Sequence, residues 1–305
     1  MHDVIVIGAG PAGLAAAVYL GRFRRQPVVL DSGDSRARWI PRSRNVPGFP
    51  QGVAGPALLR KLRSQAQKYG AQLRRCEEVT GLARSRQGFR LQLGRETLQS
   101  RFVLLATGVK DLYPSVRGVP AAQIPSLMRV CPICDGLEAQ DRRIAVIGNG
   151  PHGEREAEFL RTYSPYVTYI HMGTGGPSGP SRGITRVTAQ PEQLEMHRGK
   201  LRLRASRGGI RRFDVAYAAL GCQPRNALAR RLGAATDESG FLKVDAHQQT
   251  SVAGLYAAGD IVRGLNQVVV AAAEAVIAAT HIHNQLRAQG LPAGVRRNRS
   301  PKHAR

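Results

Sequence analysis

The feature that most constrains the fold is a glycine-rich turn near the start of the chain. Residues 3–7 are one aspartate and four apolar residues, a run typical of a buried parallel strand, and residues 8–13 then follow as Gly-Ala-Gly-Pro-Ala-Gly. A second apolar segment, residues 27–30, ends in Asp31. Strand, turn, helix, strand and acid in this order are typical of a Rossmann dinucleotide-binding unit. The sequence therefore predicts an α/β fold built on a parallel sheet.

Each part of this turn has a chemical task. The first glycine allows the tight turn, the second lets the backbone approach a pyrophosphate, and the third lets helix and strand pack closely. The helix N-terminus offers free N–H groups to the phosphates, and Asp31 is placed to accept hydrogen bonds from a ribose hydroxyl. We therefore expect a bound dinucleotide. The residues expected to contact it are Gly8, Gly10, Pro11, Ala12, Gly13, Asp31 and Ser32.

A second unit of the same kind begins near the middle of the chain. Residues 144–147 are apolar, and residues 148–153 follow as Gly-Asn-Gly-Pro-His-Gly before a helical stretch. We predict two Rossmann-like domains, the first discontinuous (residues 1–113 and 246–305) and the second inserted into it (residues 114–245). Further expected elements are helices over 14–21, 56–69, 154–161 and 267–285, and strands at 102–105, 166–170, 215–220 and 254–258.

Two of the four cysteines, Cys131 and Cys134, stand three positions apart and are followed by Asp135. A structural zinc site would need two more Cys or His ligands at similarly short spacing, so we predict a redox pair and no metal site. One thiol of such a pair is commonly acidified, and a neighbouring carboxylic acid can move the proton. Two buried structural cysteines are the alternative. Cys76 and Cys222 are isolated, and we expect them to be inert.

Several segments resemble the low-molecular-weight thioredoxin reductases, a group of the pyridine nucleotide–disulfide oxidoreductases. They are NVPGFP at 45–50, QAQKYGA at 65–71, LLATG at 104–108, CPICDG at 131–136 and LYAAGD at 255–260. The resemblance runs from residue 4 to about residue 286 and implies FAD as the cofactor. It implies further FAD contacts from Asn45, Val79, Ala106, Thr107, Gly108, Gly259, Asp260, Gln267 and Val268. One departure is Asn266, where the family usually has an arginine.

The resemblance also implies roles for the redox residues. Cys134 would lie against the flavin as the charge-transfer thiolate, Cys131 would exchange with the external disulfide, and Asp135 would be the acid–base. It implies a homodimer whose domains rotate, so that the disulfide is presented alternately to flavin and partner.

The second glycine turn departs from the family. Pro151, His152 and Gly153 stand where the family has small residues, and residues 171–176 (HMGTGG) replace the arginine-rich run that binds the 2′-phosphate of NADPH. These residues also include no acid for NAD. We favour a domain that binds no nicotinamide, with electrons coming from ferredoxin or a second flavin, or going to oxygen. Two alternatives remain: NADPH binds through other contacts, such as Arg182 or Arg186, or the domain is a scaffold for a dimer. The residues of this possible second dinucleotide site are Gly148, Gly150, Pro151, His152 and Gly153.

The net charge of +24 reflects 45 Lys and Arg against 21 acids. We interpret this excess as a solvated surface rather than a nucleic-acid interface. No apolar run reaches the roughly 18 residues of a membrane span, and the N-terminus does not resemble a signal peptide. We expect a cytoplasmic protein with no membrane or nucleic-acid partner. Residues 290–305 are expected to form a basic, disordered tail.

These observations predict an FAD-dependent enzyme that interconverts a disulfide and a dithiol through Cys131 and Cys134. Its substrate would be a thioredoxin-like protein or a small dithiol, and its electron donor or acceptor would be something other than NADPH. An ordinary NADPH-dependent thioredoxin-disulfide reductase is one alternative. A non-catalytic flavin-binding sensor or interaction protein is an alternative of another class, and the intact CPICD motif argues against it.

Overall fold

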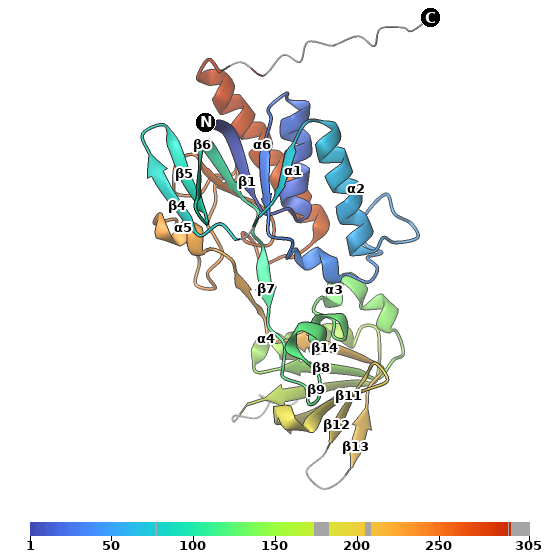
Figure 1. Cartoon of the computed structure of the whole chain (residues 1–305). Helices are drawn as coiled ribbons and strands as arrows, with labels where there is room; N and C mark the ends of the chain where they lie inside the picture. The colour runs from blue at the N-terminus through green and yellow to red at the C-terminus, as the bar shows by residue number, and fades with distance from the viewer. Residues whose placement is uncertain (77, 174–182, 205–208, 292, 294–305) are drawn as a thin grey trace, which may run out of the picture. The chain divides into compact units, whose positions relative to one another are not determined.

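The computed structural model describes residues 1–76, 78–173, 183–204, 209–291 and 293. The chain forms two compact units (Figure 1). The first comprises Met1–Arg38, Pro56–Val109 and Pro224–Arg305, and the second comprises Trp39–Gly55 and Lys110–Gln223. The chain passes between the units four times, and two of these passages fall within the short paired strands β7 (Val109–Asp111) and β15 (Cys222–Pro224).

These boundaries differ from the expected ones in two places. The chain returns to the first unit at Pro224, not at residue 246, because Ala229, Ala234 and Leu242 pack into the core of that unit. Residues 39–55, expected in the first domain, group with the second unit, where Arg44 forms an ion pair with Glu138.

The first unit is built on a seven-stranded sheet of order β3-β2-β1-β6-β5-β4, with β16 also paired to β6. The strands are β1 (His2–Ile7), β2 (Val28–Asp31), β3 (Gln72–Arg75), β4 (Gly81–Ser85), β5 (Gly88–Leu93), β6 (Glu96–Leu105) and β16 (Leu255–Ala257). β1, β2, β3, β6 and β16 pair in parallel, while β4 and β5 form an antiparallel hairpin that continues onto β6. The expected parallel sheet is confirmed.

Helices accompany this sheet as a Rossmann unit requires. They are α1 (Pro11–Arg22), α2 (Gly55–Lys68), α5 (Ala227–Arg231) and α6 (Val268–Ala288), with a 3-10 turn η1 (Arg36–Trp39). α1 and α6 pack side by side (Figure 1). A Cβ on Gly13 would overlap the carbonyl oxygen of Gly8, and one on Gly8 would overlap that of Ala106. Glycine at both positions therefore lets α1 lie directly against the strand ends.

The second unit contains a four-stranded parallel sheet of order β10-β9-β8-β14 and a three-stranded antiparallel sheet. The parallel strands are β8 (Ile144–Gly148), β9 (Val167–Met172), β10 (Ile184–Ala189) and β14 (Val215–Ala219), and the antiparallel ones are β11 (Leu194–His197), β12 (Lys200–Arg204) and β13 (Ile210–Arg212). Its helices are α3 (Pro132–Asp135) and α4 (Pro151–Leu160), with 3-10 turns η2 (Ala121–Ser126), η3 (Leu137–Ala139) and η4 (Pro191–Gln193).

Two predicted helices start earlier than expected. α1 begins at Pro11 and α4 at Pro151, because proline at the first helical position lacks an N–H that the helix could not use there. Among the described residues, no helix is long and apolar enough to cross a membrane. Residues 290 and 291 still belong to the fold, since the Leu291 carbonyl accepts hydrogen bonds from the buried Arg25, whereas residues 294–305 of the expected tail lie outside the described part.

The two glycine turns should respond differently to an added methyl group. Gly13→Ala forces a clash with backbone, so we expect it to lower the free energy of unfolding by roughly 1–3 kcal/mol, as overpacking does. Gly150 has an extended backbone, and no described heavy atom lies within 4 Å of its Cβ position. Gly150→Ala is therefore the control, with an expected change within about 0.5 kcal/mol. Urea unfolding of both variants measures this, and equal stability would contradict it.

Candidate active site

The carboxyl ends of four parallel strands bring together most of the residues expected to hold the dinucleotide. Ala106 donates its N–H to the Ile7 carbonyl at 2.8 Å, and Ala258 donates to the Leu105 carbonyl at 3.0 Å. A Cβ on Gly259 would lie 3.0 Å from the Cβ of Ala12. The turn after β1, the segment 106–108 after β6 and the turn after β16 therefore form one edge of the sheet.

The N-terminus of α1 points into this edge. Gly10 is its N-cap, and no described side chain caps the helix. The first N–H groups of a helix have no partner within it and carry a partial positive charge, so this end suits a phosphate. Among the described atoms outside the neighbouring residues, the Ser35 hydroxyl alone lies within 4 Å of the Gly10 Cβ position, at 3.3 Å. The backbone here can approach a pyrophosphate closely.

The two acids expected beside the cofactor are both held by arginines. One oxygen of Asp31 accepts the Gly33 N–H at 2.8 Å, and the other pairs with Arg63 at 2.5 Å. Asp260 pairs with Arg36 at 3.3 Å. Sequence reasoning did not find Arg36 or Arg63, because nothing distinguishes them among so many arginines. They fix the two carboxylates in place and put positive charge next to an expected anion.

A glutamate in the last helix supports the same edge. Glu274 is buried on α6, accepts the N–H of Gly259 at 2.8 Å and pairs with Arg263 at 2.8 Å. Burial raises the pKa of this carboxyl. Gly259 has a φ of +85°, which glycine adopts without strain, and Glu274 fixes this turn beside Asp260. Glu274 is the single acid of α6, within its apolar first half.

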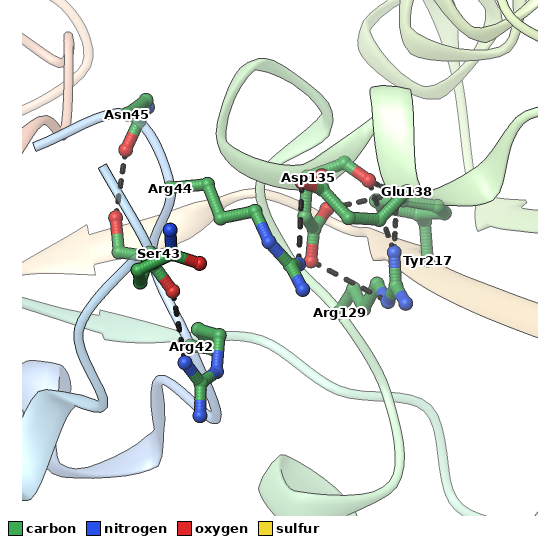
Figure 2. A network of polar contacts seen from close by, with 9 residues as sticks. Arg42, Ser43, Arg44, Asn45, Arg129, Asp135, Glu138 and Tyr217 are labelled. Carbon is green, nitrogen blue, oxygen red and sulfur yellow. Dashed lines mark hydrogen bonds and ion pairs between the residues drawn. The ribbon is translucent and has the colours of Figure 1, made fainter. Parts of the chain in front are cut away.

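The remaining expected cofactor contacts are more scattered. Ser32 lines a hollow with Arg75, Cys76 and Glu78 beside the end of β2. Burial raises the pKa of the Cys76 thiol. Val79 is buried in the core of the first unit. Gln267 is the N-cap of α6 and Val268 its first residue. Asn45 belongs to the second unit, where it accepts a hydrogen bond from Ser43 at 2.7 Å (Figure 2).

The expected redox pair is present as a disulfide between Cys131 and Cys134, with 5.3 Å between their Cα atoms. The two cysteines bracket the first turn of α3, where the Cys134 N–H bonds to the Cys131 carbonyl at 3.0 Å. Ile133, between the two cysteines, and Leu137, three residues after Cys134, have exposed side chains. A Cβ on Gly136 would lie 2.7 Å from the Tyr163 ring. The glycine of the CPICDG motif therefore lets the redox turn pack against the end of α4.

Asp135, the residue after Cys134, is held from two directions (Figure 2). Tyr217 donates its hydroxyl to one carboxylate oxygen at 2.8 Å, and Arg129 lies 3.4 Å from the other. Burial raises the pKa of Asp135, while the Arg129 charge and the Tyr217 hydrogen bond oppose that rise. A partly buried carboxyl that directly follows a redox cysteine is suited to proton transfer. Sequence reasoning found Asp135 but neither of its partners.

The second glycine turn has the expected backbone but a different surrounding. Gly148 and Gly153 pack closely against each other, with a Cβ on either lying 2.9–3.0 Å from the other's Cα. The Tyr169 hydroxyl accepts the N–H of Gly150 at 3.2 Å. In a dinucleotide site this N–H would face the pyrophosphate. In this protein the N–H of Gly150 is bonded to the Tyr169 hydroxyl instead.

Two ion pairs lie near this turn. Arg186, which the sequence offered as a stand-in for the missing phosphate ligands, lies 3.8 Å from Glu154 in the first turn of α4. His152 pairs with Glu156 at 3.2 Å, and this contact raises the pKa of its imidazole. Arg182 lies outside the described residues. Within the described part, groups of His, Cys, Asp and Glu that could hold a metal are absent.

Comparison with known proteins gives a consistent result. The family model described as pyridine nucleotide-disulphide oxidoreductase matches residues 2–175 and 181–275. A thioredoxin reductase from Mycolicibacterium smegmatis is 31% identical over 304 residues, which span 92% of this chain and 94% of that protein. The crystal structure of HlmI superposes with a TM-score of 0.83 at 26% identity, covering 95% of this chain and 94% of that one. A thioredoxin reductase from Streptococcus pyogenes has the same fold, with a TM-score of 0.82 at 22% identity, over 94% of this chain and 99% of that one.

The Asp31 carboxylate gives a test of the first site. Asp31→Asn keeps an acceptor for Gly33 but removes the charge that faces Arg63 and the expected ribose hydroxyl, so we expect FAD affinity to fall roughly 10–100-fold. Asp34→Asn is the control, because Asp34 is exposed and pairs with Arg225. Reconstitution with FAD after flavin removal measures the affinity. Release of FMN alone from the purified protein would contradict this assignment, because FMN has no adenosine ribose.

Proposed function

Since the chain belongs to the pyridine nucleotide-disulphide oxidoreductase family, as a thioredoxin reductase-like, FAD-dependent enzyme, we propose that Cys131 and Cys134 exchange electrons between bound FAD and an external disulfide. The observation that carries this proposal is the Cys131–Cys134 disulfide on a one-turn helix, followed directly by a partly buried acid. The substrate would be a thioredoxin-like protein or a small dithiol. The family resemblance also supports a homodimer.

The first unit suits FAD. The open end of α1 and the glycines at 8, 10 and 13 would hold the pyrophosphate, and Asp31 the ribose. Asp260, fixed by Arg36, would lie toward the ribityl and phosphate part of the cofactor. When bound, FAD would supply two-electron transfer to or from a thiolate. The glycine turn and the acids of this chain bind and orient it.

The roles of the two cysteines follow from the family pattern. Cys134 would exchange electrons with the flavin, and Cys131, at the N-cap of α3, would attack or be attacked by the external disulfide. Asp135 would take the proton from a thiol and return it to a leaving thiolate. The exposed Ile133 and Leu137 beside the pair would contact the substrate.

We propose further that NADPH is not the electron donor. Two observations support this: the Gly150 N–H is bonded to Tyr169, and Arg186 is paired with Glu154. The 2′-phosphate normally needs positioned guanidinium groups, each worth about 1.5–3 kcal/mol. Lack of two such contacts weakens binding by roughly 10²–10⁴-fold. We propose ferredoxin or a second flavin as the donor, or oxygen as the acceptor, in its place.

An ordinary NADPH-dependent thioredoxin reductase is the second candidate. The relative from Mycolicibacterium smegmatis carries the name thioredoxin reductase and aligns over nearly its whole length, which favours this candidate. It requires Arg186 to leave Glu154 when NADPH binds, or contacts from residues outside the described part.

Serine substitutions separate the roles of the two cysteines. Cys131→Ser should leave the Cys134 thiolate against the flavin and keep a long-wavelength thiolate–flavin absorption band, whereas Cys134→Ser should lose it. Both should abolish disulfide turnover. Anaerobic absorption spectra after reduction measure the band. A band that survives only in Cys134→Ser means that the roles are reversed.

Rapid mixing under nitrogen tests the donor. We expect dithiothreitol to reduce the flavin readily, and NADPH and NADH to reduce it slowly or not at all, because Arg186 is paired with Glu154 and the Gly150 N–H is bonded to Tyr169. The flavin absorbance after stopped-flow mixing is the readout. Full bleaching within seconds at sub-millimolar NADPH identifies an ordinary NADPH-dependent reductase and refutes the proposal on the donor.

A further inference from the structure

Asp135 forms part of a closed network with two residues that the motif does not contain. Arg129 donates to the backbone carbonyl of Asp135 at 3.0 Å and to the Tyr217 hydroxyl at 3.3 Å. Tyr217 donates to the Asp135 carboxylate at 2.8 Å and lies 3.2 Å from the same backbone carbonyl. Figure 2 shows the three side chains converging from α3, β14 and the segment before the first cysteine. Each member therefore contacts both of the others.

We propose that Arg129 and Tyr217 are positioning residues for disulfide exchange, which hold the Asp135 carboxylate in place and keep it available as a proton acceptor next to Cys134. This inference rests on the proposed function, since it assigns to Asp135 the proton transfer of that reaction. Arg129 and Tyr217 themselves act only through Asp135.

The backbone fixes both residues before their side chains meet. Arg129 forms a parallel β-bridge with Tyr217 at the edge of β14. The Arg129 N–H donates to the Ala216 carbonyl at 2.9 Å, and the Arg129 carbonyl accepts the N–H of Ala218 at 2.8 Å. Residues paired across two parallel strands put their side chains on the same face of the sheet. The Arg129 guanidinium also lies 5.8 Å from the centre of the Tyr217 ring. The parallel sheet therefore anchors the segment that leads into the redox turn.

The charges around Asp135 oppose the effect of its burial. Burial favours the neutral acid and raises the pKa of Asp135, and the charge of Glu138 adds to the rise. Arg129 and the Tyr217 hydroxyl lower it. Glu138 is itself paired with Arg44 at 3.3 Å. Burial and the Asp135 charge raise the pKa of Tyr217, so that it stays protonated and remains a hydrogen-bond donor.

Reduction of an external disulfide by the reduced cysteine pair depends on this network through Asp135. In the reduced protein, the Cys131 thiol gives its proton to Asp135 while its sulfur attacks the external disulfide, which forms a mixed disulfide and releases one thiolate. Asp135 returns the proton to that thiolate. The Cys134 sulfur then attacks Cys131, re-forms the Cys131–Cys134 bond and releases the second substrate thiolate, which takes the Cys134 proton. Two electrons and two protons have passed from the cysteine pair to the substrate.

The pH dependence of this exchange tests the proposal. Tyr217→Phe removes a hydrogen bond to the ionised carboxylate, so the pKa of Asp135 should rise and the acidic limb of the rate profile should move to higher pH by about 0.5–1 unit. Exchange at the low-pH end should slow by about 3–10-fold, with little change on the plateau. Tyr163→Phe is the matched control, because its ring packs against the same turn at Gly136. Stopped-flow reaction of the pre-reduced protein with glutathione disulfide gives the profile without any external electron donor.

A second pair of variants guards against simple misfolding. Arg129→Met should move the same limb upward, and Arg129→Lys should restore part of the shift because it keeps the charge. In an Asp135→Asn background, Tyr217→Phe should have no further effect on the pH profile. Equal slowing at every pH, or an unchanged limb in both Tyr217→Phe and Arg129→Met, overturns the proposal. A different result would contradict the proposed function itself: the reduced Cys131→Ser variant would react with glutathione disulfide as fast as the unchanged protein does.

Discussion

The fold depends on the close approach of backbone at the carboxyl ends of parallel strands. Glycine at 8 and 13 removes the Cβ atoms that would overlap carbonyl oxygens, and α1 can therefore begin directly above the strand ends. This contact leaves the open helix end, Asp31 and Asp260 along one edge of the sheet. The same constraint shapes the second unit, where Gly148 and Gly153 face each other beneath α4. One packing rule thus produces two structurally similar turns.

Similar backbones do not give similar sites. In the first unit arginines orient the acids next to the helix end. In the second unit Tyr169 takes a turn N–H, and the charged groups Glu154, Arg186 and His152 pair within the protein. The difference lies in side chains on β9, β10 and α4, not in the turn itself. A glycine motif therefore identifies a dinucleotide fold, while the residues around it decide what binds.

Local sequence patterns predicted the elements that depend on local chemistry. Apolar runs and the two glycine turns located β1, β2, β8 and their helices, and the cysteine spacing located the redox turn. Contacts between distant segments could not be predicted in this way. Arg63 is 32 positions from Asp31, and Tyr217 is 82 positions from Asp135, so neither pair leaves a spacing signal. The strands β11–β13 were also missed, because charged residues alternate through them without an apolar run.

The central claim is that FAD and the Cys131–Cys134 pair form one connected redox system in each chain. Anaerobic titration of the purified flavoprotein with dithionite, followed by flavin absorbance and by a count of free thiols, tests it most directly. We expect uptake of about four electrons per chain, two by the flavin and two by the disulfide, and about two in Cys134→Ser. Uptake of only about two electrons by the unchanged protein, with the disulfide still intact, would contradict the account.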